Sequence, residues 1–297
     1  MNAILSKFSF ILIITFSGIC LAGEKVSQSL SVDAAGVVFV EIPRGLVKIQ
    51  GWDKQEVMIQ GELDDTLKAL TFKTKEDKTL IKVDTQGRRH WGDASLLKIF
   101  MPQQSKLRFK GIDTSFSIAK LSSHIEGKSI TGDLLVKKSN GKIKLSVVSG
   151  DVRLVESSGV IQVESVNGAI NFSGVFDKAL LKSMSGDIAA DISGTKKLTI
   201  KNISGDTQVS GQVKNQARLK FTSVSGDILY RVTDDLNAEC EMVSQFGGEI
   251  NNQLTDDLPI DSSSHKKTLS FISGDGSGKL VMKTITGSVT IEKIINE

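Results

Sequence analysis

The feature that most constrains the fold is a short turn motif that recurs along most of the chain. It consists of an apolar residue, a Ser, Thr or Asn, a Gly, and usually an Asp followed by a second apolar residue. The first four motif glycines lie 18 residues apart, and further copies follow at wider or narrower intervals: Gly132, Gly150, Gly168, Gly186, Gly205, Gly226, Gly248, Gly274 and Gly287. A fixed period of this kind is typical of stacked structural repeats. The sequence therefore predicts a solenoid in which each repeat forms one coil.

The residues between the motifs favour strands over helices. Short alternating stretches such as Lys142–Leu145 and Val160–Val163 have the two-residue period of a half-buried strand. A second turn, for example Ser157 to Gly159, divides each unit near its middle. Glycine accepts the positive φ that a tight corner needs, and Ser and Asp can hydrogen-bond turn amides. We therefore predict an all-β, single-stranded β-helix (β-solenoid) with coils of about 18 residues and two or three strands per coil.

The apolar residues that flank the motif predict two columns of core side chains. The first column precedes the glycine and consists of Ile130, Val148, Val166, Met184, Ile203, Val224 and Phe246. The second follows the Asp position and consists of Leu134, Val152, Ile170, Ile188, Ile228 and Ile250, with Thr207 interrupting it. Stacking would bury both columns in one continuous core.

The chain is expected to divide into three parts, namely residues 1–23, 24–104 and 105–297. The middle part is rich in strands but less regular, with strands expected at 37–42, 57–60, 80–83 and 96–101 and an early coil at 45–52. We interpret it as a strand-rich N-terminal cap or entry region of the solenoid at 105–297, because an exposed terminal coil must be covered. A separate small β-domain is the alternative.

Residues 1–23 are predicted to be a cleaved signal peptide. Lys7 precedes an apolar run from Phe8 to Phe16 that is too short to span a bilayer, and small residues follow at Ala22 and Gly23. Lipidation at Cys20 is the less favoured alternative, because Ile19 stands where a lipobox needs a small residue. After cleavage Cys240 is the single cysteine, so no internal disulfide can form. The expected location is periplasmic or extracellular, without a transmembrane segment after signal removal.

Candidate chemical sites are few, and each has a simple structural interpretation. The acids Asp133, Asp151, Asp187, Asp206 and Asp227 recur at the turns; we interpret them as turn caps rather than as calcium ligands or, for Asp187 and Asp206, a hydrolytic pair. His90, His124 and His265 lack the spacing of a zinc site. The segments Arg88–Asp93 and Asn251–Lys267 are interpreted as exposed loops, although the first, with Trp91, could contact a sugar or an anionic polymer. We predict no catalytic, cofactor-binding or metal-binding residues and no enzymatic activity.

The overall charge gives no sign of a nucleic-acid partner. Without Lys7 the chain has 36 Lys and Arg against 34 Asp and Glu, a net charge of +2. A nucleic-acid-binding or strongly polyanion-binding chain usually has a larger basic excess. We therefore expect no nucleic-acid partner, and the extended surface of a repeat scaffold predicts an unknown protein or glycan partner of the cell envelope.

These motifs resemble the bacterial putative-adhesin family, domain-of-unknown-function β-solenoids with repeated Ser-Gly-Asp turns. The resemblance rests on the turns from Gly132 to Asp227, on Gly45–Trp52 and on Ser273–Val289, and it extends from about Val37 to Ile294. It implies a single-stranded β-helix in the cell envelope and no known enzymatic activity. We therefore predict an exported, non-catalytic structural, adhesin-like or interaction module of the cell envelope. The alternative is a polysaccharide-binding or polysaccharide-cleaving β-helix protein.

Overall fold

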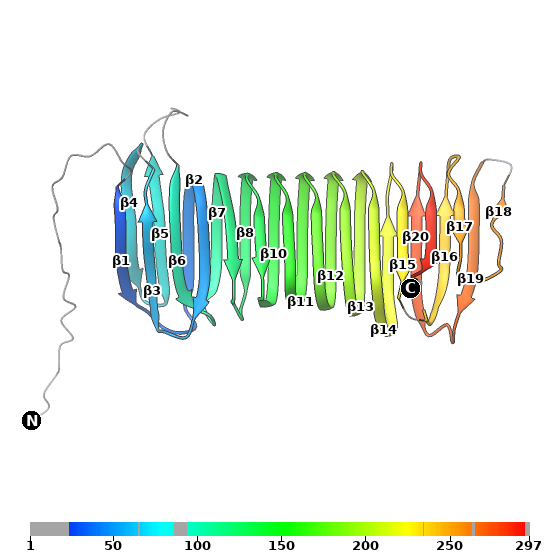
Figure 1. The fold of residues 1–297 in the computed structure, drawn as a ribbon, viewed down its shortest axis with the longest axis horizontal. Coiled ribbons are helices and arrows are strands. Elements are labelled where there is room, and N and C mark those ends of the chain that lie inside the picture. Colours follow the sequence, from blue (N-terminus) through cyan, green and yellow to red (C-terminus); the bar gives the residue numbers. More distant parts are fainter. Residues whose placement is uncertain (1–23, 65, 86–93, 234, 263–264, 295–297) are drawn as a thin grey trace, which may run out of the picture.

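The computed structural model describes residues 24–64, 66–85, 94–233, 235–262 and 265–294, and the predicted signal peptide lies outside them. These residues form strands, turns and bends without a helix, and the strands stack into one elongated solenoid (Figure 1). Within the described ranges there is accordingly no helix long and apolar enough to cross a membrane. The predicted all-β solenoid is confirmed.

The strands in chain order are β1 (Lys25–Ser31), β2 (Val37–Trp52), β3 (Glu56–Glu62), β4 (Leu67–Lys75), β5 (Lys78–Thr85), β6 (Ser95–Pro102), β7 (Lys106–Ala119), β8 (Ile125–Thr131), β9 (Leu134–Lys137), β10 (Asn140–Ser149), β11 (Val152–Asn167), β12 (Ile170–Ser185), β13 (Ile188–Ser204), β14 (Thr207–Thr222), β15 (Ile228–Val232), β16 (Ala238–Ser244), β17 (Ile250–Asn252), β18 (Ile260–Asp261), β19 (Lys267–Ser273), β20 (Gly278–Thr284) and β21 (Val289–Lys293).

Each coil runs along two opposite faces of a flattened solenoid. Face 1 contains the first halves of β2 and β7, then β8, β10, the second halves of β11 to β14, and β20. Face 2 contains the second halves of β2 and β7, then β9, the first halves of β11 to β14, β15 and β21. Neighbouring coils pair in parallel and place residues 18 apart side by side, such as Ile143 with Ile161 and Val152 with Ile170. The predicted repeat length is therefore the true coil length.

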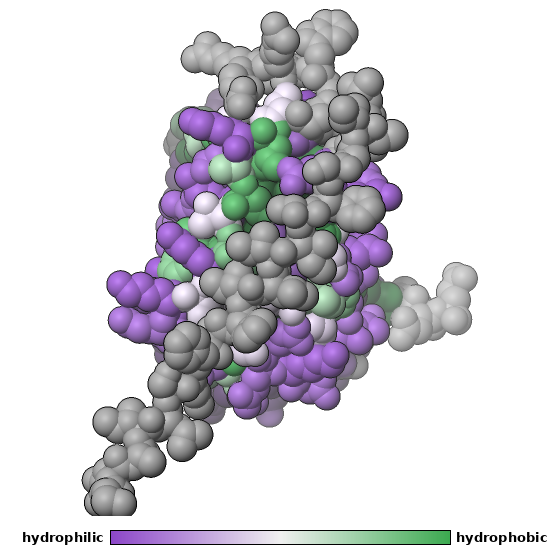
Figure 2. Space-filling view, turned by 90° about the vertical axis from the view of Figure 1, so that its left-hand side faces the viewer, coloured by the Kyte–Doolittle hydropathy of each residue, from purple (hydrophilic) through white to green (hydrophobic). Residues whose placement is uncertain are grey.

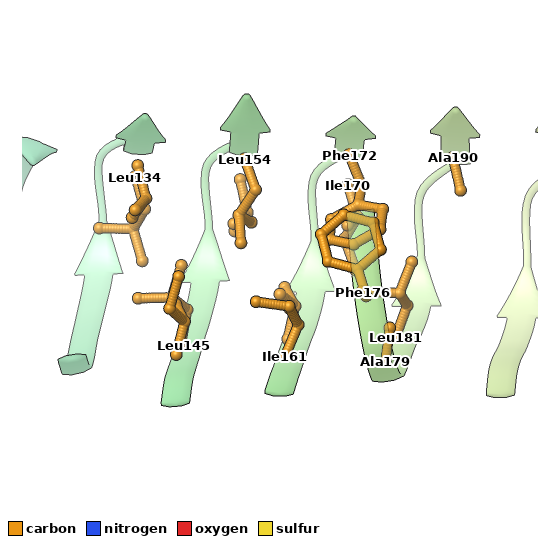
Figure 3. Packing of buried hydrophobic residues seen from close by; sticks show 14 of the residues in the cluster. Leu134, Leu145, Leu154, Ile161, Ile170, Phe172, Phe176, Ala179, Leu181 and Ala190 are labelled. Carbon is orange, nitrogen blue, oxygen red and sulfur yellow. The ribbon is translucent and has the colours of Figure 1, made fainter. Parts of the chain in front are cut away.

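The core lies between the two faces. Side chains from face 1, such as Leu145 and Leu181, point toward those from face 2, such as Leu134 and Leu154, and the arrangement repeats from coil to coil (Figure 3). The second predicted column is confirmed, because all its members and Thr207 are buried.

The first predicted column is wrong. Its members point outward, and Ile130 and Met184 remain 50% and 52% exposed. Alternation along the strand gives the inward position to the preceding residue, which is small or polar in most coils. Asn202 is one such residue: its buried Nδ2 donates to the corner carbonyls of Gly205 and Gly186, at 2.8 and 3.2 Å. In other coils the inward residue is the apolar Val147 or the small Ser183, so the alternation of the strand, rather than a polar contact in every coil, places the apolar neighbour outside.

Both ends of the solenoid are covered by strands that fold back. At the N-terminal end β3 pairs antiparallel with β6 and β1, and β4 pairs antiparallel with β5. The buried Asp64 accepts a hydrogen bond from Arg44 Nε at 2.9 Å there; burial acts to raise the pKa of Asp64, but Arg44 and Thr66 together hold it below its usual value. In the view onto this end, hydrophobic residues gather in the middle of the surface between hydrophilic flanks (Figure 2). Strands on either side of residue 104 pair directly, β2 with β7.

At the C-terminal end the order of the coils departs from the order of the chain. The last strands, β20 and β21, lie between β14–β15 and β16–β17 (Figure 1). Beyond them β19 pairs antiparallel with β16, and β18 with β19. The expected loop 251–267 therefore contains short strands at the edge of the solenoid, where Leu258 and Ile260 are exposed.

Candidate interaction surface

The repeated acids form a carboxylate ladder, namely Asp133, Asp151, Asp187, Asp206 and Asp227 at one edge of face 2. Each carboxylate accepts the backbone amide of the equivalent residue one coil further on. Asp133 Oδ1 accepts the amide of Asp151 at 2.9 Å, and Asp206 Oδ1 accepts that of Asp227 at 2.9 Å. The predicted turn-capping role is confirmed, and the capped amide belongs to the neighbouring coil.

Asp187 and Asp206, the pair for which hydrolysis is the less favoured alternative, make the same capping contacts. Asp187 Oδ1 accepts the amide of Asp206 at 2.8 Å, so both carboxylates have a structural partner. No group of three or more His, Cys, Asp or Glu residues in the described ranges could hold a metal ion. His90 and the segment Arg88–Asp93 lie outside the described residues.

We expect Asp206→Ala to lower the free energy of unfolding by about 1–3 kcal/mol, because the amide of Asp227 loses a charged acceptor. Asp206→Asn keeps an oxygen acceptor, so its loss in the free energy of unfolding should be less than half that of Asp206→Ala. Asp191→Ala, a control on the same face, removes an exposed carboxylate that accepts only a long 3.5 Å contact from Ser210. Urea unfolding with calcium and with chelator measures all three variants. A wild-type stability that depends on calcium, with equal losses for Ala and Asn, would contradict the capping role.

Charge is segregated between the two faces. The outward positions of face 1 from β7 to β20 carry two carboxylates, Glu126 and Glu164. The same positions carry many cations, which define the basic face: Lys106, Arg108, Lys110, Lys128, Lys142, Lys144, Lys178, Lys182, Lys197, Lys201, Arg218, Lys220, Lys279 and Lys283. Face 2 carries the carboxylate ladder and three outward cations between β9 and β21, Lys137, Arg153 and Arg231. A nearly neutral chain thus has one strongly basic surface.

One row of the basic face aligns four cations on successive coils, namely Lys178, Lys197, Arg218 and Lys279, which we call the cation row. Lys178 pairs with Lys197, Lys197 with Arg218, and Arg218 with Lys279 in the sheet register. All four side chains are exposed, and within the described part of the chain no carboxylate lies within ion-pair distance of any of them. Other cations of this face are paired, such as Lys182 with Glu164 at 2.9 Å.

An apolar row runs along the edge of the same face, beside the glycine corners. Its members occupy matching positions on successive coils and are exposed except for the half-buried Val166: Ile112, Ile130, Val148, Val166, Met184, Ile203, Val224 and Ile285. At its N-terminal end a groove of about 530 Å³ is lined by Pro43, Ile112, Ile130 and Val148 together with Lys110 and Lys128. A smaller hollow of about 300 Å³ lies on face 2 near Arg153 and Asp191.

Residues 44–292 match the model of the Toastrack DUF4097 family. The chain belongs to the Toastrack family. A putative adhesin from Parabacteroides merdae shares the Toastrack chain's fold, with a TM-score of 0.54 at 13% identity over 92% of this chain and 97% of the other. A putative adhesin from Bacteroides fragilis matches with a TM-score of 0.43 at 13% identity over 93% of this chain and all of the other. No curated protein matches.

Both rows of this Toastrack chain can be recognised in the sequence by their spacing from the motif glycines, although the overall composition does not show them. The cation row lies eight residues before a corner glycine, as in Lys178 before Gly186 and Lys279 before Gly287. The apolar row lies two residues before the same glycines. Aligning the repeats on their glycines, rather than summing charge over the chain, would have revealed both rows.

Proposed function

We propose that this protein is an exported, non-catalytic interaction module of the cell envelope whose basic face binds an anionic partner. The observation that carries the proposal is the unpaired cation row, Lys178, Lys197, Arg218 and Lys279, held in register on four coils. Residues 24–104 serve as the cap of this module, and residues 1–23 direct its export to the periplasm or the cell exterior.

The cation row is unfavourable for the isolated protein. Parallel neighbours lie about 4.8 Å apart, and like charges directly opposite each other on a sheet destabilise it. Each such contact costs about 1 kcal/mol in water. Anions bound along the row would relieve this repulsion, and the rigid sheet holds the cations in place before binding. The row is therefore better suited to a partner with repeated negative charge than to stabilising the fold.

The acids favour a binding role over catalysis. The ladder carboxylates are engaged by backbone amides, as Asp187 and Asp206 show. The basic face carries two carboxylates from β7 to β20, and one of them, Glu164, is bound by Lys182 at 2.9 Å. A flat, rigid and extended surface is how repeat proteins commonly bind their partners.

A charge-matched pair of variants tests the proposal. The basic-face variant is Lys178→Gln, Lys197→Gln and Arg218→Gln, and the face 2 control is Lys137→Gln, Arg153→Gln and Arg231→Gln. Both lose the same net charge, so long-range attraction changes equally. Binding to dextran sulfate and to neutral dextran is measured at several salt concentrations.

We expect the basic-face variant to bind dextran sulfate at least about tenfold more weakly, because exposed ion pairs contribute up to about 1 kcal/mol each. The face 2 control should bind like the wild type, and neutral dextran should bind none of the three. Equal losses in both variants, or wild-type binding that is independent of salt, would contradict the proposal.

A further inference from the structure

We infer that the anionic partner is the surface of a phospholipid bilayer with acidic headgroups, on which face 1 lies flat with its apolar row at the headgroup boundary. This inference rests on the proposed function, because it uses the same basic face. It adds the apolar row, which a soluble polyanion would leave in water.

The apolar row is an outward feature of the fold rather than a displaced part of the core. The inward position beside it is filled by other buried residues from the coil of Ile130 onward. Asn202 and Thr284 at this position hydrogen-bond corner carbonyls, and Val147 at the same position packs in the core. Met184, Ile203 and Val224 are 52%, 48% and 42% exposed on adjacent coils. Contiguous exposed apolar surface bordered by polar residues is typical of interaction sites.

The cations and the apolar row lie on one flat surface. Lys178 and Met184 belong to the same strand, β12, with Leu180 and Lys182 as the outward residues between them. Alternate residues of a strand are about 7 Å apart, so the cation row and the apolar row are about 20 Å apart and run parallel. Over eight coils the apolar row extends roughly 35 Å. Surface-bound amphipathic elements combine the same two features, cations for acidic headgroups and apolar side chains at the acyl boundary.

The groove at the start of the apolar row fits the same partner. Its apolar lining includes Pro43, Ile112 and Ile130, and Lys110 and Lys128 stand on the side of the basic face. Its volume of about 530 Å³ lies in the range of sites that bind small apolar ligands. The same lining contains Glu41, 3.7 Å from Lys110, and Asp84, 2.8 Å from Lys82, so both carboxylates are paired with lysines. An acyl chain in the groove would place its headgroup beside Lys128, which has no ion-pair partner among the described residues.

The charge of the two faces supports this orientation. Asp191 points outward from face 2, whereas the basic face belongs to face 1, so an acidic membrane attracts face 1 more strongly. The carboxylate ladder lies at the glycine corner, three residues after the apolar row, where its oxygens accept backbone amides of the next coil.

Vesicle sedimentation of the mature chain, residues 24–297, tests the inference. The vesicles are phosphatidylglycerol with phosphatidylcholine, and phosphatidylcholine alone. The apolar-row variant is Met184→Ser, Ile203→Ser and Val224→Ser. Its control replaces exposed apolar residues elsewhere, Leu46→Ser, Val155→Ser and Val175→Ser. Binding of the same proteins to dextran sulfate is measured in parallel, and thermal unfolding confirms that each variant is folded.

We expect the wild type to bind the acidic vesicles and not the neutral ones. The basic-face variant should bind them about 100-fold more weakly, since each basic side chain near an acidic surface contributes about a factor of five. The apolar-row variant should bind them at least tenfold more weakly and bind dextran sulfate like the wild type. The apolar control should behave like the wild type in both assays.

The possible failures are distinguishable. If the apolar-row variant and the wild type bind acidic vesicles equally, the bilayer inference is overturned while the basic face keeps its proposed role. Binding to dextran sulfate without binding to vesicles overturns the inference in the same way and points to an acidic polysaccharide. If the wild type binds neither dextran sulfate nor acidic vesicles, both the bilayer inference and the proposed function are overturned. If the apolar-row variant does not fold, the single substitution Ile203→Ser gives the same comparison.

Discussion

Gly168→Ala should lower the free energy of unfolding by about 3 kcal/mol or more. Gly168 has φ +131°, and a Cβ there would lie 2.2 Å from the carbonyl oxygen of Gly150 in the coil below. The strained φ costs about 1–3 kcal/mol, and the clash adds a cost of similar size because the neighbouring backbone cannot move away. Chemical denaturation followed by circular dichroism measures the loss.

Gly247→Ala is the matched control for this corner. Gly247 also has positive φ, +76°, but a Cβ there would meet nothing within 4 Å. We expect Gly247→Ala to lower the free energy of unfolding by about 1 kcal/mol, which is the cost of placing an alanine in the left-handed backbone region without a clash. Equal losses at Gly168 and Gly247 would show that close stacking of the corners contributes nothing to the stability.

Phe176→Ala should cost about 3–5 kcal/mol, the usual range for a fully buried aromatic side chain. Phe176 is 1% exposed and packs against Phe172, with ring centroids 3.7 Å apart. It fills the core where β12 bulges at the second corner of its coil. The neighbouring Val175 is 49% exposed, so Val175→Ala should change the stability by less than about 0.5 kcal/mol. A loss below 1 kcal/mol for Phe176→Ala would mean that this corner is not close-packed.

The repeat made the architecture predictable from the sequence. An 18-residue period marked by glycine determines the coil length, the parallel register and the corner positions, and the expected coil at 45–52 is part of β2, which pairs with β6 and β7. The strands expected before residue 104 lie within β2, β3, β5 and β6. The order of the last coils was not predictable, because the turn motif is the same wherever a coil stacks. Only tertiary contact places β20 beside β14.

The basic face and the apolar row were not predicted from the sequence because of two assumptions about side-chain placement. The first was that an apolar residue beside a turn points inward. Strand alternation instead places Val147 and Ser183 inside, so Val148 and Met184 point outward. The second was that a nearly neutral composition means a nearly neutral surface. Parallel stacking repeats each position along one row, so a cation recurring at one position, as in Lys178 and Lys197, charges a whole face.

The most direct test of the account is a fluorescence measurement at one position on each face. Val148→Cys in the apolar row and Ala189→Cys on face 2 are labelled with an environment-sensitive dye in the mature chain, in which Cys240 is the single native cysteine. Burial raises the pKa of the Cys240 thiol to about 12, so this cysteine stays unlabelled in the folded protein. On addition of acidic vesicles, the account predicts a blue shift of the dye at residue 148 and none at residue 189. A shift confined to residue 189, or equal shifts at both positions, would contradict it.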